Sequence, residues 1–262
     1  MIHVITAVHN RYSITEKLID QLLRQTYKDI HLILVDDGST DGTADMVNTR
    51  FPNSTIITGN GNLWWGGALH KAYKWIDASC NDKEEYVLIS NDDVEFESDY
   101  IEKGVKYLKT SNKTLISGVG IGNITHKVVD LPIIWDFPKF KGNPVLDLSL
   151  SGNCVSTRSL FCRTTDIIKI GGFHPILLPH YLSDYEWTMR ASKKGYSIRA
   201  FNDLTYIVKE DTTGLRVRKQ MTGKQLMSKK SNANPIYRLS FLLMATPVNY
   251  WLSAMKSQFE RM

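Results

Sequence analysis

The chain has 262 residues, of which 42% are hydrophobic and 23% are charged, and a formal net charge of +5. This composition is ordinary for a globular protein, so it excludes a disordered, collagen-like or repeat protein and allows one large domain with a buried core. The three cysteines and seven histidines show no metal-site spacing, and the cysteines favour a reduced, cytoplasmic compartment. We expect neither a secretory signal, because Met1 leads directly into a strand-like run, nor a membrane span.

The first half of the chain alternates strand-like and helix-like segments. Short runs of branched apolar residues predict strands at residues 2–8, 31–35, 55–58 and 86–90. Apolar residues at helical spacing predict helices at residues 14–22, 41–50 and 68–80. This alternation predicts an α/β fold with a mostly parallel sheet flanked by helices. Ligands of such sheets bind beyond the carboxyl ends of the strands.

The second half is less regular. Residues 118–152 contain three prolines, and we expect an extended strand and an acceptor-side loop there. Short helices are predicted at 164–170 and 187–194. From Asn234 onwards, apolar residues at helical spacing predict an amphipathic helix that packs on the core or lies at a membrane surface.

The segment from Arg216 to Lys230 has six Lys or Arg and no acidic residue. A solvated charged face explains this segment as well as attraction to lipid head groups or to a phosphate-bearing substrate does. Since no nucleic-acid-binding module accompanies the segment, we do not expect nucleic acid as a partner.

Asp92 and Asp93 follow the strand at 86–90, directly after Asn91. Two adjacent carboxylates at the end of a buried strand repel each other and lose hydration unless a cation lies beside them. A divalent cation that also binds a diphosphate satisfies both carboxylates and stabilises a leaving nucleoside diphosphate. The alternative is an ordinary strand-to-loop turn, where Asn and Asp are favoured.

Two other strand ends carry polar residues. Asp36 and Asp37 follow the second strand, and their carboxylates can accept hydrogen bonds from a base N–H or a ribose hydroxyl. The alternative is a turn that caps the next helix. The end of the first strand would complete a nucleoside pocket with Thr6, Ala7, Val8, Asn10 and Arg11, although Arg11 is equally well explained as a surface cation.

The loop at residues 59–67 contains a tandem Trp beside a tandem Gly. Glycine lets the backbone approach a ligand closely, and Trp faces are common platforms for sugars and bases. We therefore place Asn62, Trp65 and Gly66 on the donor side and Trp64 on the acceptor side. The alternative is that both rings fill core space beneath the loop.

In combination and in order, these motifs resemble those of the family 2 glycosyltransferases. The matching segments are Thr6 to Arg11, Val35 to Asp41, Asn91 to Asp93, Ser151 to Asn153, Gly171 to Phe173, and Ser183 to Trp187. The resemblance covers roughly residues 1–215 and implies a GT-A fold with a Rossmann-like sheet. It divides the chain into a nucleotide-binding half at 1–117, an acceptor half at 118–215, and a basic segment with a helical tail at 216–262.

The resemblance implies a single-displacement, inverting transfer of a sugar from a nucleotide sugar, with Mn²⁺ or Mg²⁺ as cofactor. Asp184 matches the general base that takes the proton of the acceptor hydroxyl, although Ser183 replaces the usual Glu before it, and Glu186 is the second candidate. The aromatic neighbours Tyr185 and Trp187 would raise the pKa of a carboxylate towards a value useful for a base.

The metal motif departs from the family pattern, because Asn91 replaces its usual first Asp. We therefore expect Asp93 to be the direct metal ligand and Asp92 to face the metal or the ribose. Many relatives carry a His after the catalytic helix, whereas residues 207–214 have none here. Lys209 is expected to contact phosphate instead.

The predicted acceptor side consists of Trp64, Gly152, Asn153, His180 and Tyr185. The tandem-Trp loop also resembles bacterial enzymes of surface polysaccharide assembly, many of them rhamnosyltransferases. This makes dTDP-rhamnose the first donor hypothesis, with a UDP-sugar as the alternative. The expected acceptor is a lipid-linked glycan of an O-antigen or capsule at the inner face of the membrane, with peripheral membrane contact through residues 216–262.

Three other classes of protein are less consistent with the sequence. A sugar-phosphate nucleotidyltransferase would need a glycine-rich phosphate loop near the first strand, which residues 6–11 do not supply. A non-catalytic nucleotide- or glycan-binding module is disfavoured because Asp93, Asp184 and Glu186 are all present. No G-x-G-x-x-G follows the first strand, which disfavours a dinucleotide-dependent oxidoreductase.

Overall fold

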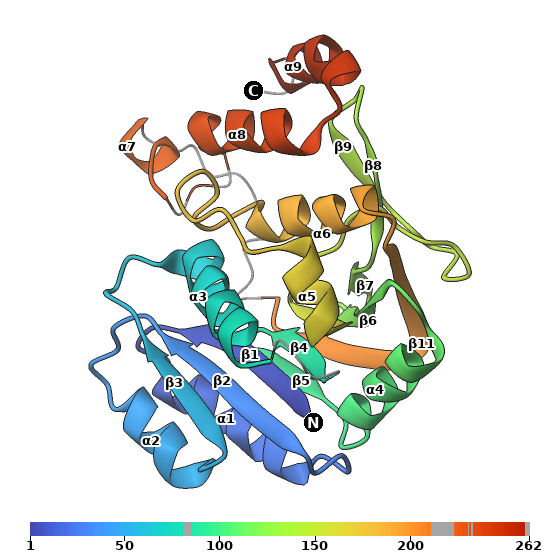
Figure 1. Cartoon of the computed structure of the whole chain (residues 1–262). Helices are drawn as coiled ribbons and strands as arrows, with labels where there is room; N and C mark the ends of the chain where they lie inside the picture. The colour runs from blue at the N-terminus through green and yellow to red at the C-terminus, as the bar shows by residue number, and fades with distance from the viewer. Residues whose placement is uncertain (81–84, 211–222, 230, 232, 260–262) are drawn as a thin grey trace.

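One mixed sheet forms the centre of the computed structural model, which describes residues 1–80, 85–210, 223–229, 231 and 233–259. Within these residues the sheet has nine strands in the order β3-β2-β1-β4-β10-β6-β11-β5, with β7 beside β6. A separate hairpin joins β8 and β9. Helices lie on both faces of the sheet (Figure 1).

The first half of the chain folds as the sequence predicts. Its elements are β1 (Ile2–Val8), α1 (Tyr12–Arg24), β2 (Ile30–Asp36), α2 (Thr43–Arg50), β3 (Ser54–Thr58), α3 (Trp64–Ser79) and β4 (Tyr86–Ser90). Strands β3, β2, β1 and β4 are parallel neighbours. The branched apolar residues of β1, β2 and β4 are buried on both faces, whereas those of the edge strand β3 are only partly buried.

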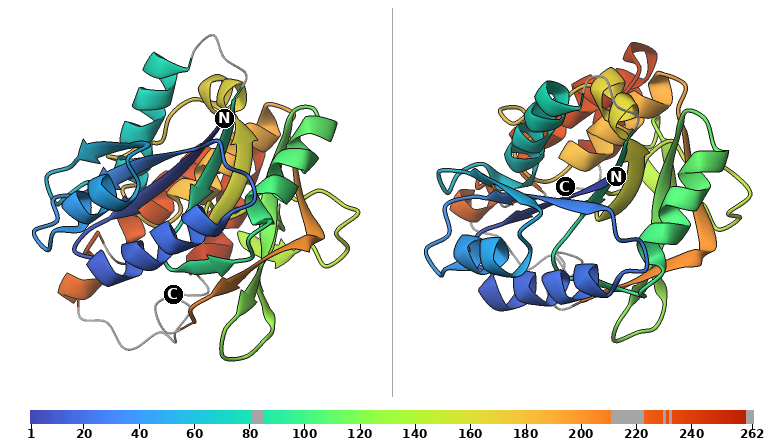
Figure 2. Two further views of the ribbon diagram at one scale, coloured as in Figure 1. Left: turned by 90° about the horizontal axis from the view of Figure 1, so that it is seen from below. Right: turned by 60° about the horizontal axis from the view of Figure 1, so that its bottom comes forward.

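The alternation of side chains along the strands creates two cores, one on each face of the sheet. Val4 and Leu32 belong to the same cluster as Leu18 of α1, whereas Ile5 and Ile33 belong to that of Leu69 of α3. Figure 2 shows the strands between α1 and α2 on one side and α3 and α5 on the other.

The second half adds elements that the sequence did not predict. Its elements are β5 (Val94–Phe96), α4 (Tyr100–Thr110), β6 (Thr114–Gly122), β7 (Val128–Asp130), β8 (Ile133–Asp136), β9 (Lys141–Pro144), β10 (Ser159–Arg163), α5 (Thr164–Ile170), α6 (Ser183–Lys193) and β11 (Ser197–Val208). Strand β10 is antiparallel to both β4 and β6, so the two halves share one sheet. The fold is nevertheless of the α/β, mostly parallel, GT-A-like class that the sequence predicts.

Two helices begin earlier than predicted. Helix α3 starts at Trp64 rather than residue 68, so the tandem Trp and Gly lie in its first turn and not in a loop. Helix α6 starts at Ser183 rather than residue 187, which places Asp184 and Glu186 in its first turn. Both shifts change the surroundings of candidate site residues.

A buried polar cluster lies at the amino-terminal ends of the strands. The side chain of His3 bonds Glu85 through Nε2 and His31 through Nδ1, both at 2.9 Å, and Cys80 Sγ lies 3.5 Å from His3 Nε2. The ligand atoms of His3, Cys80 and Glu85 lie within 4.8 Å of one another, a grouping that the spacing of histidines and cysteines in the sequence did not indicate. The contact between His3 and Glu85 has the length of a direct hydrogen bond, so the two side chains satisfy each other without an ion.

The tail forms helices broken at Pro247, rather than the one amphipathic helix that the sequence predicts. They are α7 (Gly223–Leu226), α8 (Pro235–Ala245), η1 (Val248–Tyr250) and α9 (Trp251–Phe259). Asn234 caps α8 by accepting a bond from the Ile236 N–H at 3.0 Å. Much of the predicted basic segment, residues 211–222 and Lys230, lies outside the described residues. Among the described helices, none combines the length and the hydropathy needed to cross a bilayer.

Candidate active site

The carboxyl ends of β1 and β4 meet at a buried acid pair held by an arginine. Arg11 donates from Nε to Asp92 Oδ2 at 2.8 Å and from Nη2 to Asp93 Oδ2 at 3.2 Å. Thr15 Oγ1 also donates to Asp92 Oδ2, at 3.3 Å. Burial raises the pKa of Asp92 above its ordinary value, and the bonds from Arg11 oppose this rise. Arg11 is therefore bound to the acids and is not a surface cation.

The acid pair fits a divalent cation by its chemistry. Carboxylate oxygens are the ligands that Mg²⁺ and Mn²⁺ prefer. Asp92 accepts from Arg11 and Thr15, and Asp93 accepts from Arg11 and Asn91, so these bonds do not distinguish the two acids and Asp93 as the direct ligand stays a prediction. The described residues place no third His, Cys, Asp or Glu close enough to complete a protein-only site, so diphosphate and water would supply the rest. Asn91 contacts Asp93 through its amide nitrogen, at 3.4 Å.

Asp37 shapes the segment that begins α3. Its Oδ1 accepts from the Gly61 N–H at 2.8 Å, and its Oδ2 accepts from those of Leu63 at 2.8 Å and Trp64 at 3.2 Å. These three bonds hold the Asp37 carboxylate against the backbone of residues 61–64. Asp36 accepts from the Ser39 N–H through Oδ1 at 2.8 Å and is buried, so its contact with a nucleoside stays a prediction.

The other residues predicted at the end of β1 have different surroundings. Thr6 is fully buried, and its hydroxyl finds no hydrogen-bond partner among the residues that the structure describes. Val8 belongs to the apolar core, and Ala7 is only partly buried. Asn10 has a φ of 51° and accepts from the Thr40 N–H at 2.8 Å, so it holds the turn after β2.

Gly66 brings two parts of the protein together rather than opening space for a ligand. Its N–H donates to the Pro179 carbonyl at 2.8 Å, and a side chain at this position would collide with the carbonyl oxygen of Leu178. Ser183, the first residue of α6, is 3.0 Å from the same point. The segment that carries Trp64 and Trp65 therefore lies directly against the start of α6.

Both Trp rings of this segment contact the predicted acceptor half. Trp65 Nε1 donates to Thr157 Oγ1 at 3.0 Å, and the ring packs on the apolar core. The Trp64 ring lies 5.6 Å from the ring of His180. The structure thus brings these two predicted acceptor-side residues together.

Asp184 combines burial with a position in the first turn of α6. Its Oδ1 accepts from the Tyr185 N–H at 2.9 Å, and the backbone of Thr157 also bonds to it. Burial nevertheless raises the pKa of Asp184 to about 6. A carboxylate with this pKa can take up and release a proton near neutral pH, as a general base must.

Glu186 has a different environment, although it lies only two residues further on. Arg190 binds its two oxygens, each at 2.9 Å, and also donates to the carbonyl oxygens of Ile170 and Gly172. The Glu186 carboxylate is therefore part of an ion pair that joins α6 to the end of α5. This arrangement favours Asp184 over Glu186 as the base.

A second buried arginine, which the sequence analysis did not single out, links the acid pair to Asp184. Arg158 Nη1 donates to Asp130 Oδ2 at 3.1 Å, and Tyr206 and Ser156 donate to the same oxygen. Burial is the largest single effect and lowers the pKa of Arg158, but the fields of Asp130, Tyr206, Asp93 and Asp184 together outweigh it, so the pKa is raised. Arg158 Nε is buried and finds no partner in the described part of the chain.

No sequence signal pointed to this network. Arg158 stands in an unremarkable Ser-Thr-Arg-Ser stretch and Asp130 at the end of a short strand. They meet because β10 and β7 both pair with β6. On its other side β10 lies beside β4, and the Asn91 N–H donates to the Arg158 carbonyl at 3.0 Å.

The remaining predicted residues support the site from further away. Asn153 accepts from the Trp135 N–H at 2.7 Å, and Gly152 forms a bridge with Ile198 against Pro132. Tyr185 packs against the Trp135 ring. Lys209 forms an ion pair with Glu95 at 3.4 Å, so its predicted phosphate contact stays a prediction.

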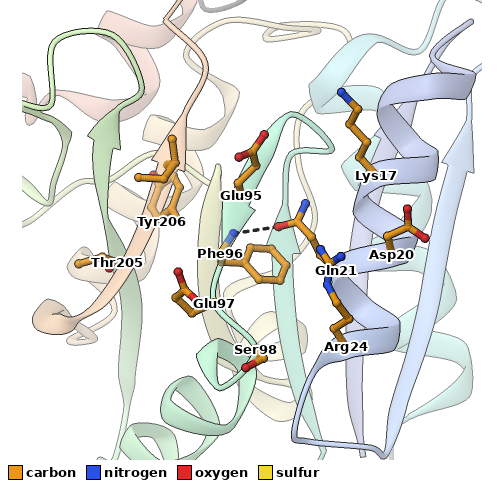
Figure 3. A pocket seen from close by; sticks show the side chains of 11 residues that line it. Lys17, Asp20, Gln21, Arg24, Glu95, Phe96, Glu97, Ser98, Thr205 and Tyr206 are labelled. Carbon is orange, nitrogen blue, oxygen red and sulfur yellow. Dashed lines mark hydrogen bonds between the residues drawn. The ribbon is translucent and has the colours of Figure 1, made fainter.

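A cavity of about 650 Å³ lies elsewhere, between α1, β5 and β11. Figure 3 shows Gln21 of α1 accepting a bond from the backbone of Phe96, with side chains of both charges around it. None of the residues that line it is a predicted site residue. The mixed charge of the lining indicates no single class of ligand.

The fold is GT-A-like, with acid residues at the ends of its strands. Residues 3–166, more than half of the chain, match the family model described as "Glycosyl transferase family 2". The chain therefore belongs to this family.

Three solved structures are similar to the chain in fold. The mannosyltransferase PcManGT from Pyrobaculum calidifontis, in complex with GDP-Man and Mn²⁺, has a TM-score of 0.60 and 17% identity over 98% of this chain and 73% of its own. S. aureus TarS 1–349 has a TM-score of 0.63 and 15% identity over 99% and 72%. GalNAc-T7 with UDP, GalNAc and Mn²⁺ has a TM-score of 0.64 and 10% identity over 80% and 44%.

A curated relative is similar in sequence over a shorter stretch. The N-acetylglucosaminyl-diphospho-decaprenol L-rhamnosyltransferase of Mycobacterium tuberculosis is 27% identical over 86 residues. The match covers 31% of this chain and spans only 28% of the length of that relative.

We predict that Gly66→Ala destabilises the protein and lowers its activity. The added methyl group meets the Leu178 carbonyl oxygen, a backbone atom that cannot move without moving the start of α6, and such overpacking costs about 1–3 kcal/mol. Gly67→Ala is the matched control, since its methyl group meets only side-chain atoms at 3.3 Å or more. Thermal unfolding and transfer assays test this; equal effects of the two substitutions would contradict the proposed contact.

We predict that Arg158 binds the donor diphosphate in addition to pairing with Asp130. Arg158→Met should weaken nucleoside diphosphate binding by about tenfold or more, the usual loss for a bond to a charged group. Adding Asp130→Asn removes the buried charge that Arg158 leaves behind and should restore stability but not binding. If the double variant binds the nucleotide like the wild type in calorimetry, Arg158 serves the fold alone. Arg50→Met, in a surface ion pair with Glu16 and Asp20, is the control.

Proposed function

We propose that this protein is an inverting glycosyltransferase that moves a hexosyl group from a dTDP- or UDP-sugar to a glycan hydroxyl, with Asp184 as the general base. The observation that carries this proposal is the position of Asp184. It is a partly buried carboxylate with a pKa of about 6, and Arg158 lies within electrostatic reach of both Asp184 and Asp93. A nucleotidyltransferase does not fit the family, and a non-catalytic module has no use for such a group.

The chemistry follows from the order of charges across the site. Asp184 takes the proton of the acceptor hydroxyl as that oxygen attacks the anomeric carbon, and the bond from this carbon to the diphosphate breaks. Arg11 and Arg158 would stabilise the negative charge that the leaving diphosphate gains. A divalent ion, which Asp93 and Asp92 would hold, supplies further positive charge to the diphosphate. The relatives PcManGT and GalNAc-T7 were solved with Mn²⁺, which supports this cofactor.

The donor and the acceptor follow from similarity in sequence to a curated relative. The 86-residue similarity to a rhamnosyltransferase favours dTDP-rhamnose, and the name of that relative indicates a lipid-linked acceptor. By this similarity we propose an acceptor glycan of surface polysaccharide assembly at the cytoplasmic face of the membrane. The first donor test is nucleotide binding by calorimetry with UDP, dTDP, GDP and CDP, with and without Mn²⁺ or Mg²⁺.

Asp184→Asn is predicted to lower transfer by about 10²-fold or more, as expected for loss of a general base. Because the folded pKa of Asp184 is above its ordinary value of 3.8, its ionisation destabilises the fold as pH rises from about 4 to 6. The neutral Asn should therefore raise the unfolding temperature at pH 7.5 while it removes activity. In the wild type, kcat/KM should rise with pH and level off above about 6.

Glu186→Gln serves as the comparison for Asp184→Asn. It breaks the ion pair with Arg190 and should lower the unfolding temperature, with much of the transfer activity retained below that temperature. If Asp184→Asn keeps normal turnover, or if only Glu186→Gln loses it, the base is not Asp184.

Asp93→Ala is predicted to weaken metal-dependent nucleoside diphosphate binding by about tenfold or more, because a carboxylate ligand of the cation is lost. Glu97→Ala, an exposed carboxylate four residues away, should leave the affinity unchanged. Calorimetry with Mn²⁺ and dTDP or UDP measures both. Equal affinities of Asp93→Ala and the wild type would remove Asp93 from the metal site.

A further inference from the structure

The C-terminal helices expose an unusual amount of apolar surface. Helix α8 exposes Ile236 (56%), Leu239 (47%) and Leu243 (42%), which are three and four residues apart and so share one face of the helix. The next two elements expose Val248 (72%) and Leu252 (82%). Scattered exposed apolar residues are normal, but such a concentration on adjoining helices indicates an interaction surface.

Helix α8 is apolar on its inner face too. Phe241, Leu242 and Ala245 are buried in a cluster that includes Met189 of α6 and, at its edge, Tyr185, the neighbour of Asp184. Figure 1 shows α6 between α8 and the sheet, so α8 and α9 lie on the far side of α6 from the sheet. A helix that is apolar all round is normally covered on both sides. In the described part of the chain nothing covers the outer face of α8.

The described residues between 223 and 259 carry charge of one sign. They include Lys224, Lys229, Arg238 and Lys256 and no Asp or Glu. Arg238 stands between Ile236 and Leu239 in the sequence, and the exposed Lys256 follows Leu252 by one helical turn. The surface therefore combines exposed apolar side chains with basic residues and has no acidic ones among its described residues. Such a surface is complementary to a partner that has anionic groups on its outside and an apolar layer directly below them.

We propose that the outer face of α8, η1 and α9 docks on an anionic lipid bilayer. The apolar side chains enter the boundary between head groups and acyl chains, and the basic residues contact the anionic head groups. A second copy of this chain would present the same positive charge, which argues against self-association through this face. The docking itself stands on the surface alone, whereas a role in reaching a lipid-linked acceptor rests on the proposed function.

The test uses the full chain and vesicle flotation, with phosphatidylcholine alone or mixed with phosphatidylglycerol. The variant Leu239→Gln, Leu243→Gln, Leu252→Gln removes exposed apolar groups, so the fold should be retained. Its matched control is Ile124→Gln, Leu146→Gln, Leu150→Gln, which are equally exposed elsewhere (59%, 81% and 54%). We expect the wild type and the control to bind the mixed vesicles, and the α8–α9 variant to bind about tenfold or more weakly.

Binding should also weaken with added salt and with Lys229→Gln, Lys256→Gln, since these exposed lysines contribute the electrostatic part. Equal vesicle binding by both triple variants, or no binding by the wild type, would overturn the proposal. So would light scattering that shows a lipid-free dimer which only the α8–α9 variant loses. Nucleotide binding is measured on the same samples. If the wild type does not bind nucleotide, the proposed function is wrong. If it binds nucleotide but does not float with the vesicles, only the proposed docking surface is wrong.

Discussion

Carboxylates buried at the carboxyl ends of the central strands need positive charge, and two arginines from distant parts of the chain supply it. Arg11, just before α1, bonds Asp92 and Asp93, and Arg158, just before β10, bonds Asp130. Removing one partner of such a pair strands a buried charge, at a cost of about 3–5 kcal/mol. The beginning of α1 and the place of β10 in the sheet are therefore tied to the same group of acids that the proposed chemistry uses.

Two acids in the first turn of α6 show how local surroundings assign different roles to the same kind of side chain. Glu186 meets a guanidinium that matches both of its oxygens, so its charge is neutralised and the pair joins two helices. Asp184 meets mainly backbone N–H groups within a buried setting, which leaves its proton affinity high. The sequence alone does not show which of the two acids pairs with Arg190. The pair forms with Glu186 because, once α6 has formed, residues i and i+4 lie on the same face of the helix.

How far the sequence predicted the structure depended on whether the signal was local. Branched apolar runs fixed β1, β2, β3 and β4, and the acids that follow them were placed correctly at the strand ends. Strand β10 was missed because its run, Ser159 to Arg163, is short and precedes a helix directly. The ion pair between Arg158 and Asp130 was missed for the same reason, because it depends on the antiparallel position of β10 in the sheet. Gly66 was interpreted as space for a ligand, but the close approach is made by the backbone of Leu178 and Pro179, which are more than a hundred residues away.

The antiparallel insertion of β10 also determines how the chain can be divided. A fragment that stopped at residue 117 would cut β6 in the middle and leave β4 without its partner on one side. Val87, Leu88 and Ile89 would then lie on an open sheet edge, which invites pairing with other chains and aggregation. The shortest self-contained piece must extend through β10, and the match to the family ends at residue 166, three residues beyond that strand. We therefore do not expect the predicted nucleotide-binding half, residues 1–117, to fold as a separate unit.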